Sequence, residues 1–138
     1  MMPCDLPGAD DARPELPVTL AGGCHCGAVR FRVTLRRWLA SDCNCSLCTM
    51  KGYLHLIVPQ GDFELLSPES AVTTYTFNTG VAKHHFCKIC GVHSYYVPRS
   101  HPDGFSVNAR CLDEPHLEWF DLEPFDGRNW EAAAPTLR

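Results

Sequence analysis

The sequence predicts an all-β protein, because turn-forming residues recur at short intervals and the segments between them favour strands. No stretch keeps a 3.6-residue hydrophobic period over several helical turns. With 138 residues, the chain fits one domain with a modest core. The turn formers are Gly22-Gly23, Pro59-Gln60-Gly61, Asn78-Thr79-Gly80, Pro98 and Pro102-Asp103-Gly104.

The expected strands are short segments that alternate in hydropathy or concentrate β-branched and aromatic residues. They are residues 28–33, 54–58, 72–77, 93–97 and 105–107. In the first of them, Val29, Phe31 and Val33 share one face, because successive side chains of a strand point to opposite sides. One short helical turn is expected at residues 131–134, where Pro135 would end it.

The composition is that of an ordinary globular protein, with 45% hydrophobic and 20% charged residues. Residues 1–18, rich in proline and acidic side chains, are expected to form a flexible arm, so that a single domain spans residues 19–138. A net charge of -4 argues against nucleic-acid binding, which needs clustered lysine and arginine. In the one basic cluster, Arg30 and Arg32 alternate with apolar residues, which indicates the solvent-facing side of a strand.

The chain has nine cysteines, and their chemistry depends on the compartment. The N-terminal residues show no signal segment, and the longest purely apolar run, Leu56-Ile57-Val58, is far shorter than the roughly 20 residues of a membrane span. The protein is therefore expected in the cytoplasm, away from membranes, where thiols stay reduced. Abundant cysteine there indicates metal binding or catalysis rather than a disulfide framework.

Four of the cysteines form what we call the four-cysteine group: Cys24, Cys26, Cys87 and Cys90. Cys87-x-x-Cys90-Gly91 has the form of a zinc knuckle, in which the glycine lets the backbone turn tightly around the sulfurs. Paired with Cys24-x-Cys26, it supplies the four thiolates of a closed, structural zinc site. A redox role for the knuckle is disfavoured, because no βαβ pattern surrounds it.

Cys43, Cys45 and Cys48 remain and form the three-cysteine group. Three protein ligands with a vacant fourth position are typical of catalytic zinc. The alternative is that a histidine, either His55, His84 or His93, closes this shell and makes the second site structural as well. The two other cysteines, Cys4 and Cys111, are interpreted as bystanders.

A zinc ion bound by three thiolates has a formal charge of -1, because two positive charges meet three negative ones. Such an electron-rich ion is a weak Lewis acid and is poorly suited to ionising water. It is better suited to bind a further soft ligand, a substrate thiol, and to hold it as a nucleophile. The expected chemistry is therefore addition of a thiol to an electrophile such as an aldehyde.

The motifs resemble those of the glutathione-dependent formaldehyde-activating enzymes, a family that includes centromere protein V. The resemblance rests on Gly23-Cys24-His25-Cys26-Gly27, Cys43-x-Cys45-x-x-Cys48 and Phe86-Cys87-x-x-Cys90-Gly91, in that order. It extends from about Gly22 to Trp130. Thr74-Tyr75-Thr76-Phe77-Asn78-Thr79 and Tyr96-Val97-Pro98-Arg99-Ser100 are especially similar to the centromere protein V branch.

The resemblance implies a β-tent fold like that of the Mss4 superfamily, built from small antiparallel sheets pinned by zinc. It implies two zinc ions per chain, one structural in the four-cysteine group and one catalytic in the three-cysteine group. The activity it implies is that of a carbon–sulfur lyase, which adds glutathione to formaldehyde and gives S-(hydroxymethyl)glutathione. The alternative is a non-catalytic zinc-binding interaction module resembling centromere protein V.

Other residues have weaker sequence support. His84 matches a family histidine and is expected either to assist the open site or to be bonded to backbone. Glutathione is anionic, so cations near the open zinc are candidates for binding it. The cationic candidates are Lys51, Lys83, Arg99 and Arg110. The aromatic residues interpreted as core, rim or packing of the C-terminal segment are Tyr53, Tyr95, Tyr96, Trp119 and Trp130.

Overall fold

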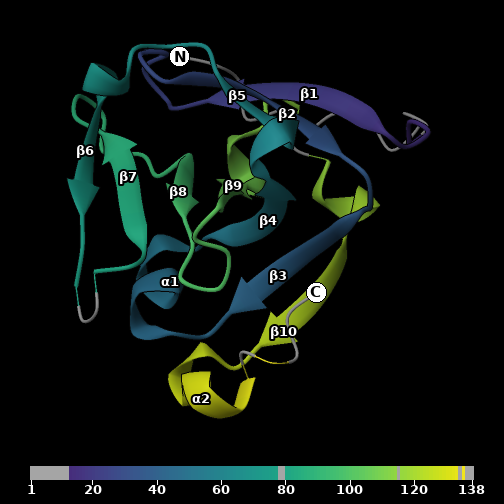
Figure 1. Cartoon of the computed structure of the whole chain (residues 1–138). Helices are drawn as coiled ribbons and strands as arrows, with labels where there is room; N and C mark the ends of the chain where they lie inside the picture. Colours follow the sequence, from purple (N-terminus) through teal and green to yellow (C-terminus); the bar gives the residue numbers. More distant parts are fainter. Residues whose placement is uncertain (1–12, 78–79, 115, 134, 136–138) are drawn as a thin grey trace.

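The computed structural model describes residues 13–77, 80–114, 116–133 and 135, which fold into two β-sheets (Figure 1). The smaller sheet is antiparallel and has the order β1-β2-β5. Its strands are β1 (Val18–Gly23), β2 (Arg30–Leu35) and β5 (Phe63–Leu65). In Figure 1 it lies across the top of the larger sheet.

The larger sheet has seven strands in the order β10-β3-β4-β9-β8-β7-β6. They are β3 (Leu39–Cys43), β4 (Leu54–Pro59), β6 (Val72–Tyr75), β7 (Lys83–Cys87), β8 (Tyr95–Val97), β9 (Gly104–Asn108) and β10 (Asp121–Phe125). Neighbouring strands pair antiparallel, except that β10 runs parallel to β3. The all-β prediction is confirmed.

Helices are short and lie in the connections between strands or after the last strand, β10. Helix α1 (Ser46–Lys51) follows β3 and was not predicted, whereas α2 (Trp130–Ala133) corresponds to the expected turn at 131–134, whose last residue lies outside the described part. Single 3-10 turns make up the rest. They are η1 (Gln60–Asp62), η2 (Glu69–Ala71), η3 (Ala109–Cys111), η4 (Leu117–Trp119) and η5 (Gly127–Asn129).

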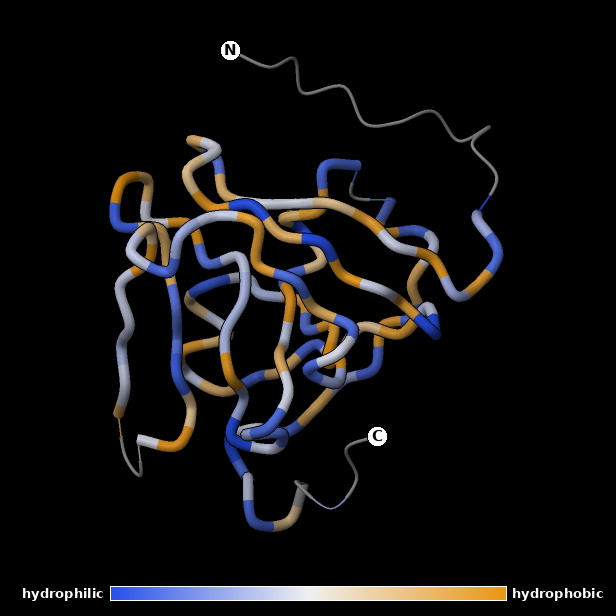
Figure 2. Tube along the Cα trace, turned by 45° about the horizontal axis from the view of Figure 1, so that its top comes forward, coloured by the Kyte–Doolittle hydropathy of each residue, from blue (hydrophilic) through white to orange (hydrophobic). Residues whose placement is uncertain are grey.

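The main core lies between the two sheets. Phe31 and Val33 of β2 are fully buried and belong to one apolar cluster with Leu56 of β4 and Val107 of β9. Figure 2 shows hydrophobic and hydrophilic residues alternating along the strands, as expected for sheets with one buried face. The buried face of β2 is the one that the sequence predicted.

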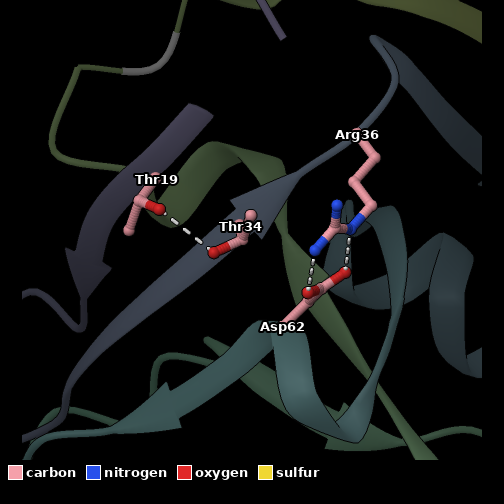
Figure 3. A network of polar contacts seen from close by, with 4 residues as sticks. All are labelled: Thr19, Thr34, Arg36 and Asp62. Carbon is pink, nitrogen blue, oxygen red and sulfur yellow. Dashed lines mark hydrogen bonds and ion pairs between the residues drawn. The ribbon is translucent and has the colours of Figure 1, made fainter. Parts of the chain in front are cut away.

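Polar contacts fasten the outer face of the smaller sheet (Figure 3). The hydroxyl oxygens of Thr19 and Thr34 lie 3.0 Å apart across β1 and β2. Just after β2, the Arg36 guanidinium donates to both carboxylate oxygens of Asp62 in η1, at 2.9 and 3.1 Å. Arg30 and Arg32 form ion pairs with Asp113 and Glu64 at 2.6 and 3.1 Å. Arg30 and Arg32 thus lie on the solvent-facing side of β2, as predicted, and the structure adds their ion pairs.

The expected arm at residues 1–18 lies mostly outside the described residues, so its boundary stays a prediction. Strand β1 begins at Val18, close to the predicted start of order. Before it, the Arg13 guanidinium donates to the carbonyl oxygen of Trp119 at 3.1 Å and lies over the ring of Trp38 at 5.8 Å.

Candidate metal centres and active site

The four-cysteine group comes together from two turns that are distant in sequence. The sulfurs of Cys24, Cys26, Cys87 and Cys90 all lie within 4.8 Å of one another. Cys26 Sγ lies 3.6 Å from Cys24 Sγ and 3.6 Å from Cys87 Sγ. Cys24 Sγ also accepts a hydrogen bond from the backbone nitrogen of Val29 at 3.3 Å. The predicted pairing of the knuckle with Cys24 and Cys26 is the one that the structure has.

The knuckle itself is shaped by its backbone. Cys87 is the last residue of β7, and its sulfur accepts hydrogen bonds from the backbone nitrogens of Ile89 and Cys90 at 3.4 and 3.5 Å. Gly91 then adopts a φ of 79°, a left-handed conformation that favours glycine. The turn therefore directs both sulfurs to one point, as the sequence pattern predicted.

The pKa values of these thiols differ from one another. Burial raises the pKa of Cys90, but hydrogen bonds from Val92 and Cys26 backbone groups outweigh it and lower the pKa to about 6. For Cys26, a backbone hydrogen bond from Ala28 lowers the pKa, yet lost hydration and the neighbouring thiols raise it to about 11. Four adjacent thiolates cannot all form without a cation between them, and four soft donors suit zinc.

The three-cysteine group lies where β3 passes into α1. Cys43 ends β3, and Cys45 is the N-cap of α1, where its sulfur accepts a hydrogen bond from the backbone nitrogen of Cys48 at 3.3 Å. Hydrogen bonds from the thiols of Cys43 and Cys48, and from backbone nitrogens, lower the pKa of Cys45, whereas the pKa values of the other two are raised. One thiolate forms readily, and three need a cation.

The loop after β10 packs directly against these sulfurs. A Cβ on Gly127 would lie 2.5 Å from Cys43 Sγ and 3.0 Å from Cys45 Cβ, so only glycine allows this approach. The loop is held by Asn44, whose amide donates to the Asp126 carboxylate at 3.0 Å and whose side-chain oxygen accepts from the backbone nitrogen of Arg128 at 3.1 Å.

At the second site a histidine nitrogen lies beside the sulfurs, and the sulfur of Cys45 contacts those of Cys43 and Cys48. Cys43, Cys48 and His55 place their ligand atoms within 4.8 Å of one another, and Cys45 is outside that set. His55 was one of three histidines that the sequence offered as an alternative ligand. Among the described residues, the other two, His84 and His93, do not join the set.

His55 lies in the middle of β4 and is 4% exposed. Its Nδ1 contacts the hydroxyl oxygens of Tyr96 at 2.9 Å and Ser106 at 3.2 Å, whereas its Nε2 is buried and has no hydrogen-bond partner among residues 13–77, 80–114, 116–133 and 135. Burial lowers the pKa of His55 to about 3, so the imidazole is neutral at ordinary pH. An orphaned nitrogen beside two thiols fits a metal ion.

A pocket of about 490 Å³ opens on this second site. All three members of the three-cysteine group line it, together with His55 and His84, and no member of the four-cysteine group does. The two candidate centres therefore differ in access from solvent.

His84 lies in this pocket beside Lys51. Nζ of Lys51 is 3.1 Å from Nδ1 of His84, and the imidazole stacks on the ring of Tyr96 with centroids 4.9 Å apart. Burial, with a smaller contribution from the charge of Lys51, lowers the pKa of His84 to about 4, and burial lowers that of Lys51 to about 8. His84 Nε2 has no hydrogen-bond partner among the residues that the structure describes. With an ammonium donating to Nδ1, the imidazole proton resides on Nε2.

Two arginines line the pocket. Arg99, a predicted candidate, lies over the ring of Trp130 at 4.6 Å, with Nη2 3.8 Å from Glu131. Arg128 was missed by the sequence analysis, and its Nε donates to the carbonyl oxygen of Asn44 at 2.8 Å. Trp130, interpreted as packing alone, also lines the pocket.

The remaining candidates lie away from the pocket. Lys83 donates to the carbonyl oxygen of Gly80 at 2.8 Å, and Arg110 belongs to η3. Cys111 Sγ lies 3.6 Å from a backbone carbonyl and joins neither cysteine group. Tyr53 and Tyr95 are buried, and Trp119 packs on Trp38 with centroids 5.4 Å apart. Cys4 lies outside the described residues.

This protein therefore belongs to the class of small all-β proteins that have two sulfur-rich candidate metal centres, one of which opens to a pocket. The chain belongs to the glutathione-dependent formaldehyde-activating enzyme family, whose model matches residues 19–124. The family resemblance noted in the sequence is thereby confirmed.

Individual relatives agree with this assignment. A Halomonas elongata protein, whose name assigns it provisionally to the glutathione-dependent formaldehyde-activating enzymes, is 36% identical over 127 residues, covering 75% of this chain and 81% of the relative. A crystal structure of a Rhodobacter sphaeroides protein superposes with a TM-score of 0.69 and 32% identity, covering 76% of this chain and 98% of that one. Within the described residues, no helix combines the length and hydrophobicity needed to cross a membrane.

Proposed function

We propose that this protein is a zinc-dependent enzyme of the carbon–sulfur lyase type, which joins glutathione or another small thiol to an aldehyde such as formaldehyde. One zinc ion would be structural, in the four-cysteine group, and one catalytic, at the three-cysteine group with its fourth position open. The observation that carries the proposal is the pocket, which reaches every cysteine of the second group and none of the first. A reducing compartment, the cytoplasm, would keep these thiols available.

The proposed chemistry needs a nucleophilic sulfur and a polarised carbonyl. Zinc bound at the second centre would hold the incoming thiol as a thiolate. The sulfur forms a bond to the carbonyl carbon, the carbonyl electron pair moves to oxygen, and this oxygen takes a proton. In the reverse direction the hydroxyl loses its proton and the carbon–sulfur bond breaks.

His84 is placed to serve the carbonyl oxygen. Its Nε2 has no hydrogen-bond partner in the described part of the chain, and the side chain lines the pocket. Lys51 at Nδ1 fixes the tautomer that carries a proton on Nε2. That N–H donates a hydrogen bond to the oxygen as its negative charge develops, and when its proton passes to the oxygen, the ammonium of Lys51 gives a proton to Nδ1, so the ring stays neutral.

Two guanidinium groups supply the charge that an anionic thiol requires. Arg99 and Arg128 both line the pocket, and each retains donors beyond the contacts described above. Guanidinium groups bind carboxylates through paired, charge-assisted hydrogen bonds. A glutathione molecule with its sulfur at the second centre would direct its carboxylates toward these residues.

The test is a rate measurement on the zinc-loaded protein with glutathione and formaldehyde. Because the adduct also forms spontaneously, exchange between free and adduct carbon is followed by NMR with and without protein. We expect exchange above the spontaneous rate, lowered about 100-fold by His84→Gln, which removes the proton donor. His85→Gln, on the opposite face of β7, is the matched control and should leave the rate unchanged.

No excess rate with any small thiol and aldehyde would overturn the enzymatic proposal. Specific capture of one macromolecular partner by the same inactive protein would then favour the non-catalytic interaction module.

A further inference from the structure

Four aromatic rings stack one on another from the surface of the protein into the pocket. Tyr75 stacks on Phe77 with ring centroids 5.7 Å apart, and Phe77 stacks on His84 at 5.5 Å. His84 in turn stacks on Tyr96 at 4.9 Å. Tyr75 and Phe77 are 50% and 41% exposed, whereas His84 and Tyr96 are buried. Phe77 lines the pocket, so its wall contains an apolar ring that folding leaves partly open to solvent.

Phe77 belongs to a part of the pocket lining that carries no charge, which we call the aromatic wall. The pairing of β7 with β8 brings its members together, because Ala82 precedes β7 and Pro98 follows β8. Burial lowers the pKa of His84 to about 4, so its imidazole is neutral at ordinary pH. Among the described residues that line the pocket, none is acidic. The members of the aromatic wall are Phe77, Ala82, His84, Tyr96 and Pro98.

The two guanidinium groups belong to a different part of the pocket. Strands β10 and β6 form opposite ends of the larger sheet, and Arg128 follows β10 whereas Phe77 follows β6. Arg99 follows β8, but it lies over the ring of Trp130 at 4.6 Å and so belongs to the β10 side. In Figure 1, β6 and β7 lie at the left and α2 lies at the bottom. A thiol whose carboxylates are bound by the arginines therefore leaves the aromatic wall to the aldehyde.

The place of His84 in the stack determines where a substituent on the aldehyde would lie. A carbonyl oxygen that accepts a hydrogen bond from Nε2 lies roughly 3 Å from that nitrogen, and the carbonyl carbon is about 1.2 Å from the oxygen. The ring centroid of Phe77 is 5.5 Å from that of His84. A group attached to the carbonyl carbon therefore reaches the exposed part of Phe77. Formaldehyde has only hydrogen at this carbon and would leave Phe77 uncovered.

We propose that the preferred electrophile is an aldehyde with a planar, apolar substituent, an aromatic aldehyde, and that Phe77 determines this preference. The inference rests on the proposed function for the reaction and names the class of aldehyde. The sulfur bonds to the carbonyl carbon, the carbonyl electron pair moves to oxygen, and the oxygen takes a proton, which gives an aryl hemithioacetal. A planar substituent stacks on the ring of Phe77 and removes apolar surface from water, which favours binding. The pocket volume of about 490 Å³ is in the range that encloses ligands much larger than formaldehyde.

The test compares formaldehyde with 4-nitrobenzaldehyde on the zinc-loaded, full-length protein with glutathione. Exchange between free aldehyde and adduct is followed by NMR, and each rate is divided by its own spontaneous rate. We expect the acceleration to be about tenfold or more larger for 4-nitrobenzaldehyde. Phe77→Ala should lower this ratio of accelerations about tenfold, and Phe77→Tyr, which keeps the ring, should retain it. Leu66→Ala, at an apolar position just after β5 that is 47% exposed, is the control and should leave the ratio unchanged.

The outcomes separate this inference from the proposed function. Acceleration with formaldehyde that equals or exceeds that with 4-nitrobenzaldehyde would overturn the preference and leave the enzymatic proposal intact. The same ratio in Phe77→Ala as in the unsubstituted protein would overturn the role of Phe77. No acceleration with either aldehyde would overturn both proposals. The comparison of the two aldehydes uses the unsubstituted protein, so it is decisive even if Phe77→Ala fails to fold.

Discussion

The ammonium nitrogen of Lys51 lies 3.1 Å from Nδ1 of His84 and over the rings of Tyr53 and Tyr96. Its distances to the ring centroids of Tyr53 and Tyr96 are 5.3 and 5.0 Å. Burial at this place lowers the pKa of Lys51 to about 8, which means that folding disfavours its charged form. A lysine kept where it costs stability is more readily explained by catalysis than by structure.

Replacing Lys51 should stabilise the fold and weaken the enzyme. Between about pH 8 and the pKa of an exposed lysine near 10.4, the unfolded state binds more protons than the folded state. The free energy of unfolding therefore rises with pH through this window. Lys51→Met removes the charge, so the variant should be more stable than the unsubstituted protein at about pH 7, and the difference should shrink toward about pH 10. Urea unfolding measures both values.

The activity of the same variant provides the second half of this prediction. Without a donor at Nδ1, His84 loses its fixed tautomer, so the rate should fall while the free energy of unfolding rises. Lys51→Arg, which keeps the charge, should recover part of the rate. A variant that is less stable at both pH values would contradict the assigned cost of burying Lys51.

The two metal centres should differ in what their loss does to the fold. Cys87→Ser removes one of the four ligands of the proposed structural zinc site, and metal binding at such a site supplies roughly 10 kcal/mol or more of folding free energy. The chain should then unfold or aggregate. Cys48→Ser, at the pocket, should leave the circular dichroism spectrum unchanged and lose one zinc and the activity.

Metal content per folded chain and circular dichroism check this division. Cys111→Ser is the control, since Cys111 joins neither group and both zinc ions should remain. Collapse of Cys48→Ser to the same extent as Cys87→Ser would show that both centres are structural.

Tyr96→Phe tests the support of the second centre. The substitution keeps the ring that stacks on His84 and deletes the hydroxyl that contacts His55 Nδ1 at 2.9 Å. His55 belongs to a set of residues that could hold a metal ion, and loss of such an outer contact to a ligand weakens metal binding by roughly 10- to 100-fold. Competition with a metal chelator should therefore remove one zinc at a lower chelator concentration.

Tyr53→Phe is the matched control for that measurement. Its hydroxyl donates to the carbonyl oxygen of Ser106 at 2.7 Å rather than to His55. It should lower stability without selectively releasing one zinc. Equal release by both variants would mean that the hydroxyl of Tyr96 has no specific effect on the metal.

Arg99→Gln should reveal whether the pocket binds an anionic thiol. Because Arg99 lines the pocket and its charge is proposed to bind a carboxylate, the KM for glutathione should rise about tenfold with kcat little changed. The effect should vanish with 2-mercaptoethanol, which has no carboxylate. Arg110→Gln, outside the pocket, should change neither constant, and equal effects on both thiols would argue against a carboxylate contact.

Much of the site was visible in the sequence because its chemistry is local. Spacing alone predicts candidate metal ligands in Cys87-x-x-Cys90-Gly91 and at the cysteines 43, 45 and 48. The role of His55 is not local, because its hydroxyl contacts come from Tyr96 and Ser106, 41 and 51 residues away. Only the registry of β4, β8 and β9 brings these residues together.

In the fold, too, the elements predicted from the sequence were those with a clear local pattern. Strands β2 and β4 matched because their apolar patterns report burial directly. Strand β7 was missed since His84 and His85 obscure its alternation, and β10 because most of its side chains are exposed. Helix α1, at six residues, is too short to show a period and begins where the sulfur of Cys45 caps it.

Gly127→Ala should disturb the second centre from outside its ligand set. A methyl group at this position would meet Cys43 Sγ at 2.5 Å and Cys45 Cβ at 3.0 Å, so either the loop or the sulfurs must move. Overpacking of this kind costs about 1–3 kcal/mol of unfolding free energy. We expect that loss together with weaker binding of one zinc, measured by urea unfolding and chelator competition.

Gly61→Ala is the matched control, because a Cβ there has no neighbour within 4 Å and stability should change by no more than about 0.5 kcal/mol. The comparison isolates the contact between the loop and the sulfurs, since both substitutions add one methyl group to a 3-10 turn. If Gly127→Ala kept both zinc ions as tightly as Gly61→Ala, the position of Cys43 would not depend on the loop after β10. A change in the loop after β10, which forms part of the pocket wall, would then leave the second metal centre unaffected.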